Sequence, residues 1–331
     1  MKNLFIIRSP LQVLNAYEAI AHFELKHNVF LIVQNHLDKN NQQMRDMLAM
    51  CEYEELIEMP PSKSNYFRYV ALTRKLKKHA YNFIFFGNLG SFQKLLLANL
   101  EYEKSYLFED GTCTLSYHIE LSKPQQRFSL RDMRFLLAGL SIKRKNPVGY
   151  FTIFDLEQLG QEEIVNHSFS HLKNKICKNF SHTNDVYVLG QCLVNAGLTS
   201  DEAYLHYVKV IRDNFLGEKI IYIPHRGETI TDELKSFENE NFKIFENTMP
   251  IELYFMKQKI RPKYVVSFYS MAVFTLAKIF DKSLIKSYAI CPENMKEKRK
   301  ESALFVQSFI KKAGLEVGTV CFNQSQEASH V

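Results

Sequence analysis

Two short stretches of the chain carry residue types used in general acid-base catalysis. Residues 109–112, with the sequence EDGT, place two adjacent carboxylates before a glycine. Neighbouring side chains on an extended backbone point to opposite faces, so one carboxylate can be held structurally while Asp110 serves as a general base. Residues 224–228, with the sequence PHRGE, join His225 to the fixed cation of Arg226. Because arginine stays charged and histidine can donate a proton near neutral pH, this pair predicts a phosphate site.

Three further stretches carry polar groups next to expected strands or helices. Residues 8–12 (RSPLQ) and 87–91 (GNLGS) each follow an apolar run, and residues 267–270 (SFYS) precede a helical pattern. Hydroxyls and free amides at a helix N-terminus bind anions, which predicts a phosphate contact at Ser270. An ordinary N-cap role explains Ser270, and likewise Ser9, equally well, so both interpretations stay open.

The absence of several motifs argues against some classes of enzyme and against a metal site. No two aspartates lie two positions apart, so the D-x-D arrangement that holds a divalent metal on a diphosphate is missing. The chain also lacks the glycine-rich loop of P-loop NTPases and the H-E-x-x-H helix of zinc proteases. His167 and His171 have a spacing suited to a metal on a helix, but no acidic partner follows at helical spacing. The sequence therefore predicts neither a metal site nor a bound cofactor.

The elements that must position these residues are short apolar runs that alternate with longer segments of helical period. This alternation is typical of strand-helix-strand proteins with parallel sheets, in which ligands bind beyond the carboxyl ends of the strands. Strands are expected at residues 4–7, 29–33, 56–59, 83–87, 105–108, 186–189, 220–223, 242–245, 264–268 and 287–290. Helices are expected at residues 11–25, 42–51, 67–79, 92–100, 202–215, 252–257, 272–280 and 297–313.

The length of 331 residues and the two blocks of alternation predict two doubly wound α/β domains facing across a cleft. We place an N-terminal domain at residues 1–180 and a C-terminal domain at residues 181–331. Residues 141–183 interrupt the alternation, which indicates an interdomain connection with some helix. The alternation alone does not distinguish the sugar-nucleotide transferase architecture called GT-B from other two-domain α/β proteins.

The overall composition excludes several classes of protein. With 46% hydrophobic residues and only twelve glycines, the chain is not disordered, collagen-like or a repeat array. The net charge of +6 is too small and too evenly spread for a nucleic-acid-binding protein. Six cysteines form no C-x-x-C pair, which favours free thiols in a reducing compartment. The first apolar run is too short for a signal peptide, and no window has the roughly 18 apolar residues of a membrane span, so we expect a cytoplasmic protein.

Taken together, the motifs resemble those of bacterial sialyltransferases, the group that contains glycosyltransferase families 52, 80, 38 and 97. The acidic motif of this group corresponds to residues 109–111, its histidine motif to residues 224–228 and its serine motif to residues 268–270. The chain departs from the group at two positions. Arg226 stands where the group often has proline, and Tyr269 stands where the serine motif has a second serine.

The spacing of a ribose-binding acid adds to this resemblance. Residues 250–253 (PIEL) are similar to the segment that supplies this acid, and Glu252 lies 27 residues after His225 and 18 before Ser270. Residues 9–12 are similar to the start of chains of the family 52 type. The resemblance therefore involves both halves of the chain.

The resemblance implies the GT-B fold and the inverting transfer of sialic acid from CMP-sialic acid to a terminal sugar hydroxyl. It makes residues 1–180 the acceptor and base domain and residues 181–331 the CMP-sugar-binding domain. The acceptor that it implies is galactose of a bacterial surface glycan, in lipooligosaccharide or capsule. Asp110 corresponds to the general base, with Asp201 as the alternative, and His225 protonates or stabilises the departing phosphate. One phosphate needs less charge than a diphosphate, which fits a transfer without metal. The other residues implied in CMP or phosphate binding are Arg226, Gly227, Glu252, Tyr269 and Ser270, and those of the donor or acceptor pocket are Ser9, Gln12, Asn88, Glu109, Gly111 and Thr112.

Other functions and partners stay open on the sequence. The chain could be a GT-B transferase for CMP-Kdo or a UDP-hexose, or a non-catalytic module that binds a nucleotide sugar without turnover. The basic residues between 141 and 178 suit contact with an anionic inner membrane and a lipid-linked glycan, although solvated charges explain them as well. The sequence leaves undetermined whether the linkage is α2,3 or α2,6 and whether the protein forms a homodimer.

Overall fold

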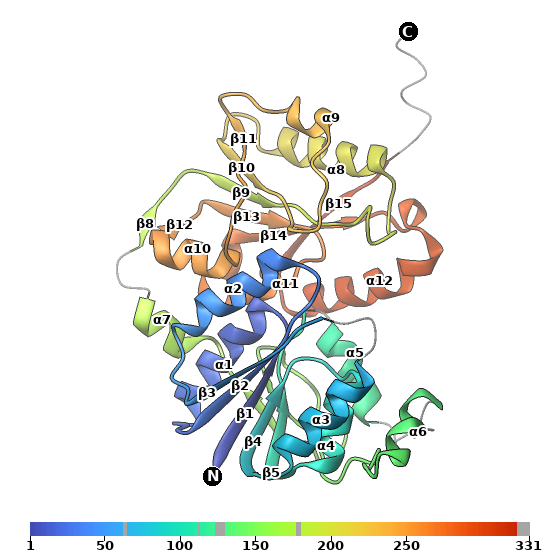
Figure 1. Ribbon diagram of the computed structural model, residues 1–331. Coiled ribbons are helices and arrows are strands. Elements are labelled where there is room, and N and C mark those ends of the chain that lie inside the picture. The colour runs from blue at the N-terminus through green and yellow to red at the C-terminus, as the bar shows by residue number, and fades with distance from the viewer. Residues whose placement is uncertain (62–64, 112, 123–129, 177–179, 323–331) are drawn as a thin grey trace. The chain divides into compact units, whose positions relative to one another are not determined.

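In the computed structural model, the described residues are 1–61, 65–111, 113–122, 130–176 and 180–322 (Figure 1). The chain divides into two compact units, Met1–Lys175 and Ile176–Val331. The first unit ends shortly before residue 180, where the sequence placed the boundary. The carboxylate of Glu18 accepts hydrogen bonds from the backbone amides of His171 and Leu172 at 3.1 and 3.0 Å. These bonds attach the segment before the boundary to the first unit.

Within the described residues, seven parallel strands form the sheet of the first unit, in the order β3-β2-β1-β4-β5-β6-β7. The strands are β1 (Lys2–Ile7), β2 (Asn28–Val33), β3 (Glu55–Met59), β4 (Ala80–Phe86), β5 (Glu101–Leu107), β6 (Gly149–Thr152) and β7 (Ile164–Asn166). The order reverses between β1 and β4. In a doubly wound sheet, the carboxyl ends of the strands at such a point form the usual ligand site.

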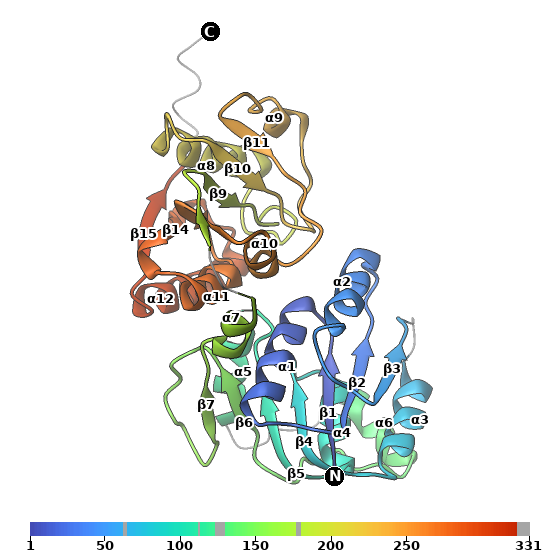
Figure 2. The ribbon, with the colours of Figure 1, turned by 90° about the vertical axis from the view of Figure 1, so that its left-hand side faces the viewer.

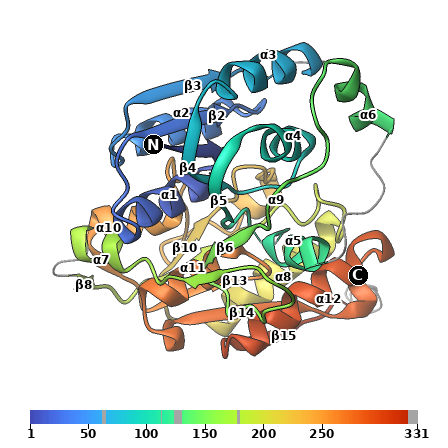
Figure 3. The same ribbon diagram turned by 90° about the horizontal axis from the view of Figure 1, so that it is seen from below.

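Helices cover both faces of the first sheet. They are α1 (Pro10–His22), α2 (Asp38–Leu48), α3 (Tyr66–Leu76), α4 (Ser91–Asn99), α5 (Cys113–Ser122), α6 (Leu130–Leu137) and α7 (Ser170–Ile176). Helix α1 packs against α2, and α3 packs against α4. Right-handed crossovers place the two pairs on opposite faces of the sheet, and Figure 3 shows α1 and α4 on its two sides.

Aromatic and aliphatic side chains form the core of the first unit. Every residue of β2 is buried, and so is every residue of β1 after the first. The ring of Phe5 stacks against Phe30 and Phe85, with ring centroids 4.9 and 4.7 Å away. Strands buried on both faces have continuous hydrophobic sequences, which is why the sequence predicted the central strands well.

The described part of the second unit contains a sheet of six parallel strands, in the order β11-β10-β9-β13-β14-β15. The strands are β9 (Val186–Leu189), β10 (Ile220–Ile223), β11 (Phe242–Ile244), β13 (Tyr264–Ser267), β14 (Ile285–Ile290) and β15 (Glu316–Val320). A separate pair consists of β8 (Ser181–His182) and β12 (Ile260–Arg261). The order reverses between β9 and β13, as it does between β1 and β4.

The helices of the second unit again lie on both faces of their sheet. They are α8 (Asp201–Asn214), α9 (Asp232–Lys235), α10 (Ile251–Gln258), α11 (Met271–Ile279) and α12 (Glu297–Lys312), with 3-10 turns at Lys282–Leu284 and Pro292–Asn294. Figure 2 shows α8 and α9 on one face and α10, α11 and α12 on the other. Among the described helices, none combines the length and the apolar character needed to cross a bilayer.

The prediction of an α/β chain with two doubly wound sheets is confirmed, and each expected strand and helix is present with ends shifted by a few residues. The prediction that residues 141–183 form an interdomain connection with some helix is right for α7 and the unit boundary after Lys175, and wrong for the part before α7. Strands β6 and β7 lie in this segment and extend the first sheet beyond β5. They contain four and three residues, which is too short for hydrophobic periodicity to reveal them.

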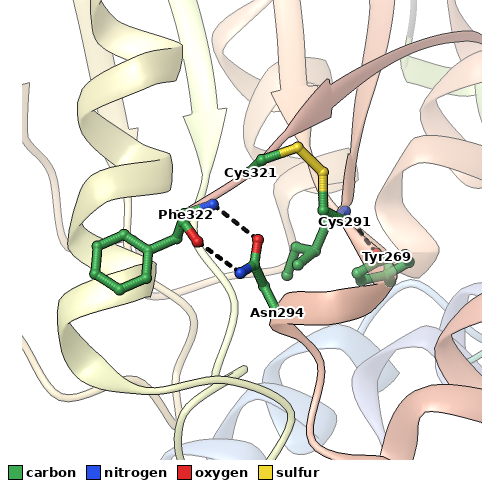
Figure 4. The surroundings of a disulfide bond; sticks show 6 residues. Tyr269, Cys291, Asn294, Cys321 and Phe322 are labelled. Carbon is green, nitrogen blue, oxygen red and sulfur yellow. Dashed lines mark hydrogen bonds between the residues drawn. A yellow bond between two sulfur atoms is a disulfide. The ribbon is translucent and has the colours of Figure 1, made fainter. Parts of the chain in front are cut away.

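A disulfide joins Cys291 to Cys321, whose Cα atoms lie 5.1 Å apart (Figure 4). The expectation of free thiols is therefore wrong for this pair. The two cysteines directly follow β14 and β15, and neighbouring parallel strands end side by side. The side chain of Asn294 adds two hydrogen bonds to the backbone of Phe322 at the same strand end. Cysteines 30 residues apart have no sequence signature, so only the fold could reveal the pairing.

Candidate functional site

The predicted site residues lie near the carboxyl ends of strands in both sheets. In the first unit, Gln12 follows β1, Asn88 follows β4 and Asp110 follows β5. In the second unit, His225 follows β10 and Ser270 follows β13. Each unit thus carries its polar residues close to the point where the strand order reverses.

In the first unit, the side chain of Gln12 connects Arg8 to Asp110, and we call these three residues and Gly87 the Asp110 cluster. Gln12 Nε2 donates a hydrogen bond to Asp110 Oδ1 at 2.6 Å, and Gln12 Oε1 accepts one from the backbone amide of Arg8 at 2.7 Å. Gln12 is fully buried, whereas Asp110 is partly exposed. Gln12, expected in the substrate pocket, therefore lies behind Asp110 and orients it.

Gly87, directly after β4, leaves the space that the Gln12 side chain occupies. A Cβ atom on Gly87 would lie 2.3 Å from Gln12 Cδ and 2.3 Å from Gln12 Nε2. Any larger residue would displace this amide and weaken its bond to Asp110. The small residue at position 87 is thus a condition for the orientation of the carboxylate.

The remaining pocket residues of the first unit differ in their surroundings. Ser9 occupies the N-cap position of α1, and in the described structure its side chain makes no capping hydrogen bond. Asn88 is 8% exposed. Gly111 has a φ of +72°, which lets the chain turn sharply after Asp110. Thr112 lies outside the described residues.

Glu109 points into the interior, so the two adjacent carboxylates do point apart as expected. Glu109 is fully buried and accepts hydrogen bonds from Thr152 Oγ1 at 2.5 Å and from the backbone amide of Ile153 at 2.8 Å. Its other oxygen lies 3.7 Å from His167 Nε2, which is also buried. Glu109, expected in the substrate pocket, therefore connects β5 with β6 and β7 and offers no exposed surface to a ligand.

In the second unit, the loop after β10 determines the tautomer of His225. His225 Nδ1 accepts a hydrogen bond from the backbone amide of Gly227 at 3.1 Å. A neutral imidazole has one N–H group, so its proton lies on Nε2, where it can be donated to a phosphate oxygen. The residue as a whole is exposed, but desolvation of the ring, followed by the Arg226 charge, lowers the pKa of His225. At neutral pH the ring is a neutral donor next to a fixed cation.

Glu228 holds the same loop from the inside. Glu228 Oε2 accepts the backbone amide of His225 at 2.9 Å, and Glu228 Oε1 accepts the hydroxyl of Tyr222. Burial raises the pKa of Glu228, and its hydrogen bonds oppose part of this effect. Sequence reasoning included Glu228 in the motif but gave it no role. The available signal was its position three residues after His225, which closes a turn.

Two tyrosines extend these contacts to the loop after β9. The hydroxyls of Tyr204 and Tyr222 lie 2.9 Å apart, and the Tyr204 oxygen accepts the backbone amide of Gln191 at 2.9 Å. Gln191 Oε1 in turn accepts the backbone amide of Tyr269 at 2.7 Å. The loops after β9, β10 and β13 are thus connected. The residues that we call the His225 network are Gln191, Tyr204, Tyr222, His225 and Glu228.

Tyr269 and Ser270 differ in what they can offer a phosphate. The Tyr269 hydroxyl accepts the backbone amide of Ile290 at 2.8 Å, and burial raises the pKa of Tyr269 to about 12. Since the Tyr269 amide is also bonded, both of its polar groups have structural partners. Ser270 Oγ accepts the backbone amide of Ala272 at 3.2 Å and caps α11. The geometry favours Ser270 over Tyr269 as a phosphate contact.

Glu252 lies in the interior of the second unit, in the first turn of α10. One of its carboxylate oxygens accepts the hydroxyl of Thr275 from α11, and burial raises the pKa of Glu252. The residue is 6% exposed. The bond joins α10 to α11, so the expected ribose contact would have to use the other carboxylate oxygen.

A cavity of about 230 Å³ lies next to the His225 network, inside the second unit. Asp201, the alternative base, lines this cavity at the start of α8. Glu202, Glu228 and Glu233 line it as well. Four acidic side chains disfavour a phosphate, and they suit a ligand that brings hydroxyl or amino donors. Asp201 and Asp110, the two candidate bases, belong to different units.

Within the described residues, one group of His, Cys, Asp and Glu side chains has its ligand atoms within 4.8 Å of one another. The group consists of Cys291, Glu293 and Cys321. A metal would require the cysteines as thiolates, and in this structure their sulfur atoms are joined to each other. The group therefore lacks two of the three ligands that it would need.

Comparison with known families finds one match that covers most of the chain. A family model described as alpha-2,8-polysialyltransferase (POLYST) matches residues 3–289. This range includes every predicted site residue, from Ser9 to Ser270. A search of curated proteins finds no significant match.

Comparison with solved structures finds proteins of similar fold and low sequence identity. A protein from Listeria monocytogenes described as a UDP-N-acetylglucosamine 2-epimerase is 9% identical with a TM-score of 0.58, covering 95% of this chain and 86% of its own. Arabidopsis thaliana UGT89C1, complexed with UDP-L-rhamnose, is 8% identical with a TM-score of 0.52, covering 96% and 85%. The UDP-GlcNAc 2-epimerase of Neisseria meningitidis is 10% identical with a TM-score of 0.52, covering 95% and 91%. At these identities the likeness shows the fold alone, which is the GT-B fold predicted from the sequence.

Proposed function

Because the chain belongs to the alpha-2,8-polysialyltransferase family, we propose that it transfers sialic acid from CMP-sialic acid to a sugar hydroxyl of a bacterial surface glycan, with inversion. The observation that carries this proposal is the family match over residues 3–289, which includes both Asp110 and His225. Membership supports the likeness to sialyltransferases in general. The particular likeness to family 52 stays a prediction.

Asp110 is the group that we assign as general base. An inverting displacement requires a base that takes the proton of the acceptor hydroxyl as it attacks the donor. The bond from Gln12 fixes one oxygen of the Asp110 carboxylate, and Gly87 keeps that bond in place. A carboxylate held in this way loses little freedom when the acceptor binds, which favours the reaction.

His225 is the group that we assign to the departing phosphate. The bond from the Gly227 amide to Nδ1 supports this role, because it leaves the proton of the neutral ring on Nε2. Nε2–H would donate to a phosphate oxygen while Arg226 supplies positive charge, and Ser270 with the start of α11 would bind the same group. A CMP leaving group has one phosphate, so these groups would suffice without a metal ion.

The acceptor is either galactose or a sugar that already carries sialic acid. The positive charge of Arg8 favours the sialylated acceptor. The description of the family names an alpha-2,8 linkage, which joins sialic acids to one another. In the described part of the chain, the Arg8 guanidinium has no ion pair. The Arg8 backbone is bonded to Gln12, which also holds Asp110. An arginine at this strand end would pair with the acceptor carboxylate, which galactose lacks.

One experiment separates the donor and acceptor alternatives. The protein is incubated with CMP-sialic acid, CMP-Kdo or a UDP-hexose, each with a galactoside or a sialylated galactoside, and the products are identified by NMR. Transfer from CMP-sialic acid supports the proposal, and transfer only from another donor replaces it. CMP binding without any turnover would instead indicate a non-catalytic module. A preference for the sialylated acceptor that Arg8→Gln abolishes would support the role of Arg8.

Substitution of the assigned residues tests the mechanism. Removing a general acid or base typically lowers the rate by about 10² to 10⁴, so Asp110→Ala and His225→Ala should each lose that much and stay folded. Asp201→Ala should keep its activity if Asp110 is the base. Asp155→Ala, which removes an exposed carboxylate of the first unit, is the matched control. Near-native transfer by Asp110→Ala together with a large loss in Asp201→Ala would move the base to Asp201.

We also propose that the protein can act at a membrane surface, because its acceptor would be part of a surface glycan carried on a lipid. Arg144 and Lys145 line a cavity of about 340 Å³ in the first unit and would bind anionic headgroups. Sedimentation with vesicles of anionic lipid at low and high salt tests this contact. Absence of binding at low salt would remove it, and light scattering of the same samples would show whether the protein is a homodimer.

A further inference from the structure

We propose that Glu228 is a positioning residue whose carboxylate keeps the His225 imidazole in the place where it stabilises the departing phosphate. This inference rests on the proposed function, since it concerns the leaving group of the same reaction. Glu228 is partly buried, and its anionic carboxylate would not itself bind the departing phosphate. Its contribution would come through the loop to which His225 belongs.

The hydrogen bonds require a carboxylate at this position. Glu228 receives two donors, the backbone amide of His225 and the hydroxyl of Tyr222, one at each oxygen. A glutamine would offer one acceptor oxygen and one amino group. Either the amino group would face the His225 amide, or the Tyr222 hydroxyl would reverse to accept from it and the Tyr204 proton would lose its acceptor. In both cases a buried donor would be left without a partner. The His225 amide would be free to move away from its present position.

The hydrogen-bond directions in the His225 network follow from its donors. The Tyr204 oxygen accepts the backbone amide of Gln191, so its own proton is available for Tyr222. The Tyr222 hydroxyl donates to Glu228. Each group in this series of hydrogen bonds donates to the next, and the series ends at Glu228, whose ionised carboxylate can only accept. Replacing this final acceptor disturbs each bond of the series.

The same network connects His225 with the second phosphate-binding element. Gln191 lies after β9, between β10 and β13, and its side chain accepts the backbone amide of Tyr269. Ser270, the next residue, caps α11. The His225 network thus links the loop that carries the imidazole to the N-terminus of α11. A phosphate that contacts both His225 and Ser270 requires a fixed distance between them.

The contact between Glu228 and Tyr222 also depends on Gly190. A Cβ atom on Gly190 would lie 2.2 Å from Glu228 Oε2 and 2.5 Å from the Tyr222 hydroxyl. Gly190→Ala therefore displaces the Glu228 carboxylate without changing any polar group. If Glu228 acts by position, adding this methyl group should have the same effect as removing the charge.

The test measures kcat and KM for CMP-sialic acid in Glu228→Gln and Gly190→Ala. We expect kcat to fall at least about tenfold in each, with KM changed less than about threefold, because the loop shifts and no substrate contact is removed. If Glu228→Gln does not fold, Tyr222→Phe takes its place, since it keeps the carboxylate and removes one donor. A loss of a few fold is expected from that variant.

Two matched controls separate position from stability. Glu240→Gln removes the same charge from an exposed site of the second unit. Gly318→Ala places a Cβ atom 2.8 Å from Cε1 of Tyr288, so it produces a similar collision at β15, away from the network. Both should keep kcat within about twofold of wild type at a temperature where they are folded. A loss of kcat in Gly318→Ala equal to that in Gly190→Ala would overturn the inference.

A second readout does not require turnover. NMR of labelled histidine reports the protonation of both ring nitrogens, and His225→Gln identifies the signals of this residue. We expect the wild-type ring to carry its proton on Nε2 and to titrate below the ordinary range. In Glu228→Gln and Gly190→Ala the pKa of His225 should rise as the ring becomes more solvated. Unchanged His225 signals together with native kcat would overturn the inference. If wild-type protein does not use CMP-sialic acid, the proposed function fails, and the His225 signals alone then decide whether Glu228 positions the ring.

Discussion

Replacement of Gln12 by leucine should lower the activity more than it lowers the stability. Gln12→Leu has nearly the same volume and removes both hydrogen bonds of the buried amide, one to the Asp110 carboxylate and one from the Arg8 backbone. A bond to a charged group contributes about 1.5 to 3 kcal/mol and a neutral one about 0.5 to 1.5, so the free energy of unfolding should fall by about 2 to 4 kcal/mol. For a unit of this size that corresponds to a decrease in Tm on the order of 10 °C.

The effect on the rate follows from the position of the base. Without the Gln12 bond the Asp110 carboxylate can rotate, and a misplacement of about 1 Å in a reacting group can lower the rate by about 10²-fold. We therefore expect kcat/KM of Gln12→Leu to fall by about two orders of magnitude at a temperature where the variant is folded. The assay is transfer from CMP-sialic acid, measured together with thermal unfolding by circular dichroism.

A matched control exists in the same unit. Asn99 is buried, and its amide makes three hydrogen bonds, to Leu95 and to the backbone of Ser141. It lies at the end of α4, just before β5 begins, and so at the opposite end of that strand from Asp110. Asn99→Leu should lose a similar amount of stability and keep its kcat. If Gln12→Leu also keeps the wild-type kcat when folded, Gln12 does not position the base and the reasoning fails.

The isosteric variant Gln12→Glu tests the same contact by charge. It places a second carboxylate at the 2.6 Å contact with Asp110, and two carboxylates so close cannot both be ionised near neutral pH. The pair would retain one proton to a higher pH than a single carboxylate does. The acidic limb of the pH–rate profile should therefore move to higher pH, and a profile that coincides with wild type would contradict the assignment.

Three further predictions concern other parts of the chain. Burial raises the pKa of Glu252, so the wild-type chain binds this proton more tightly when folded and loses stability as the pH rises through the raised pKa. Glu252→Gln keeps an acceptor for Thr275 and should lack this loss, which urea unfolding of both proteins at about pH 5 and about pH 8 would show. The disulfide between Cys291 and Cys321 closes a loop of 30 residues and should add about 3 to 4 kcal/mol, so dithiothreitol should lower the urea midpoint of wild type and leave a double serine variant unchanged. Transfer should continue in EDTA, since the proposed leaving group carries one phosphate, and a strict metal requirement would refute the assignment of its charge to His225.

The central part of the fold could be predicted because its strands are buried on both faces. Runs such as residues 29–33 are continuously apolar, and such runs hardly occur in loops. The short strands β6 and β7 could not be predicted in this way. They pair with β5 and with each other, and the buried carboxylate of Glu109 adds bonds to Thr152 and Ile153. Contacts across 43 and 44 residues have no local signature.

The candidate site could be predicted where its residues carry charge. Asp110 and His225 stand out because carboxylate and imidazole have obvious uses in catalysis. The residues that orient them are less conspicuous. In the sequence, Gln12 looks like an ordinary polar residue of a helix, and Gly190 looks like an ordinary glycine of a turn. Their roles depend on distances between segments far apart in the sequence, and only the folded chain provides these distances.

The two sheets position the residues at their strand ends by similar means, a glutamine side chain and a glycine. In each sheet a glutamine follows the first strand, next to the point where the strand order reverses: Gln12 after β1 and Gln191 after β9. A glutamine side chain has a donor and an acceptor on a neutral group, so it can be buried and connect two loops without the cost of burying a charge. In each sheet a glycine leaves space for the buried contact, Gly87 for the Gln12 side chain and Gly190 for Glu228. The groups at the strand ends are therefore held by a neutral amide in the first sheet, by a neutral amide and the Glu228 carboxylate in the second, and by space that a glycine leaves free in both. Substitutions of these inconspicuous residues should be as damaging to the rate as changes next to the substrate.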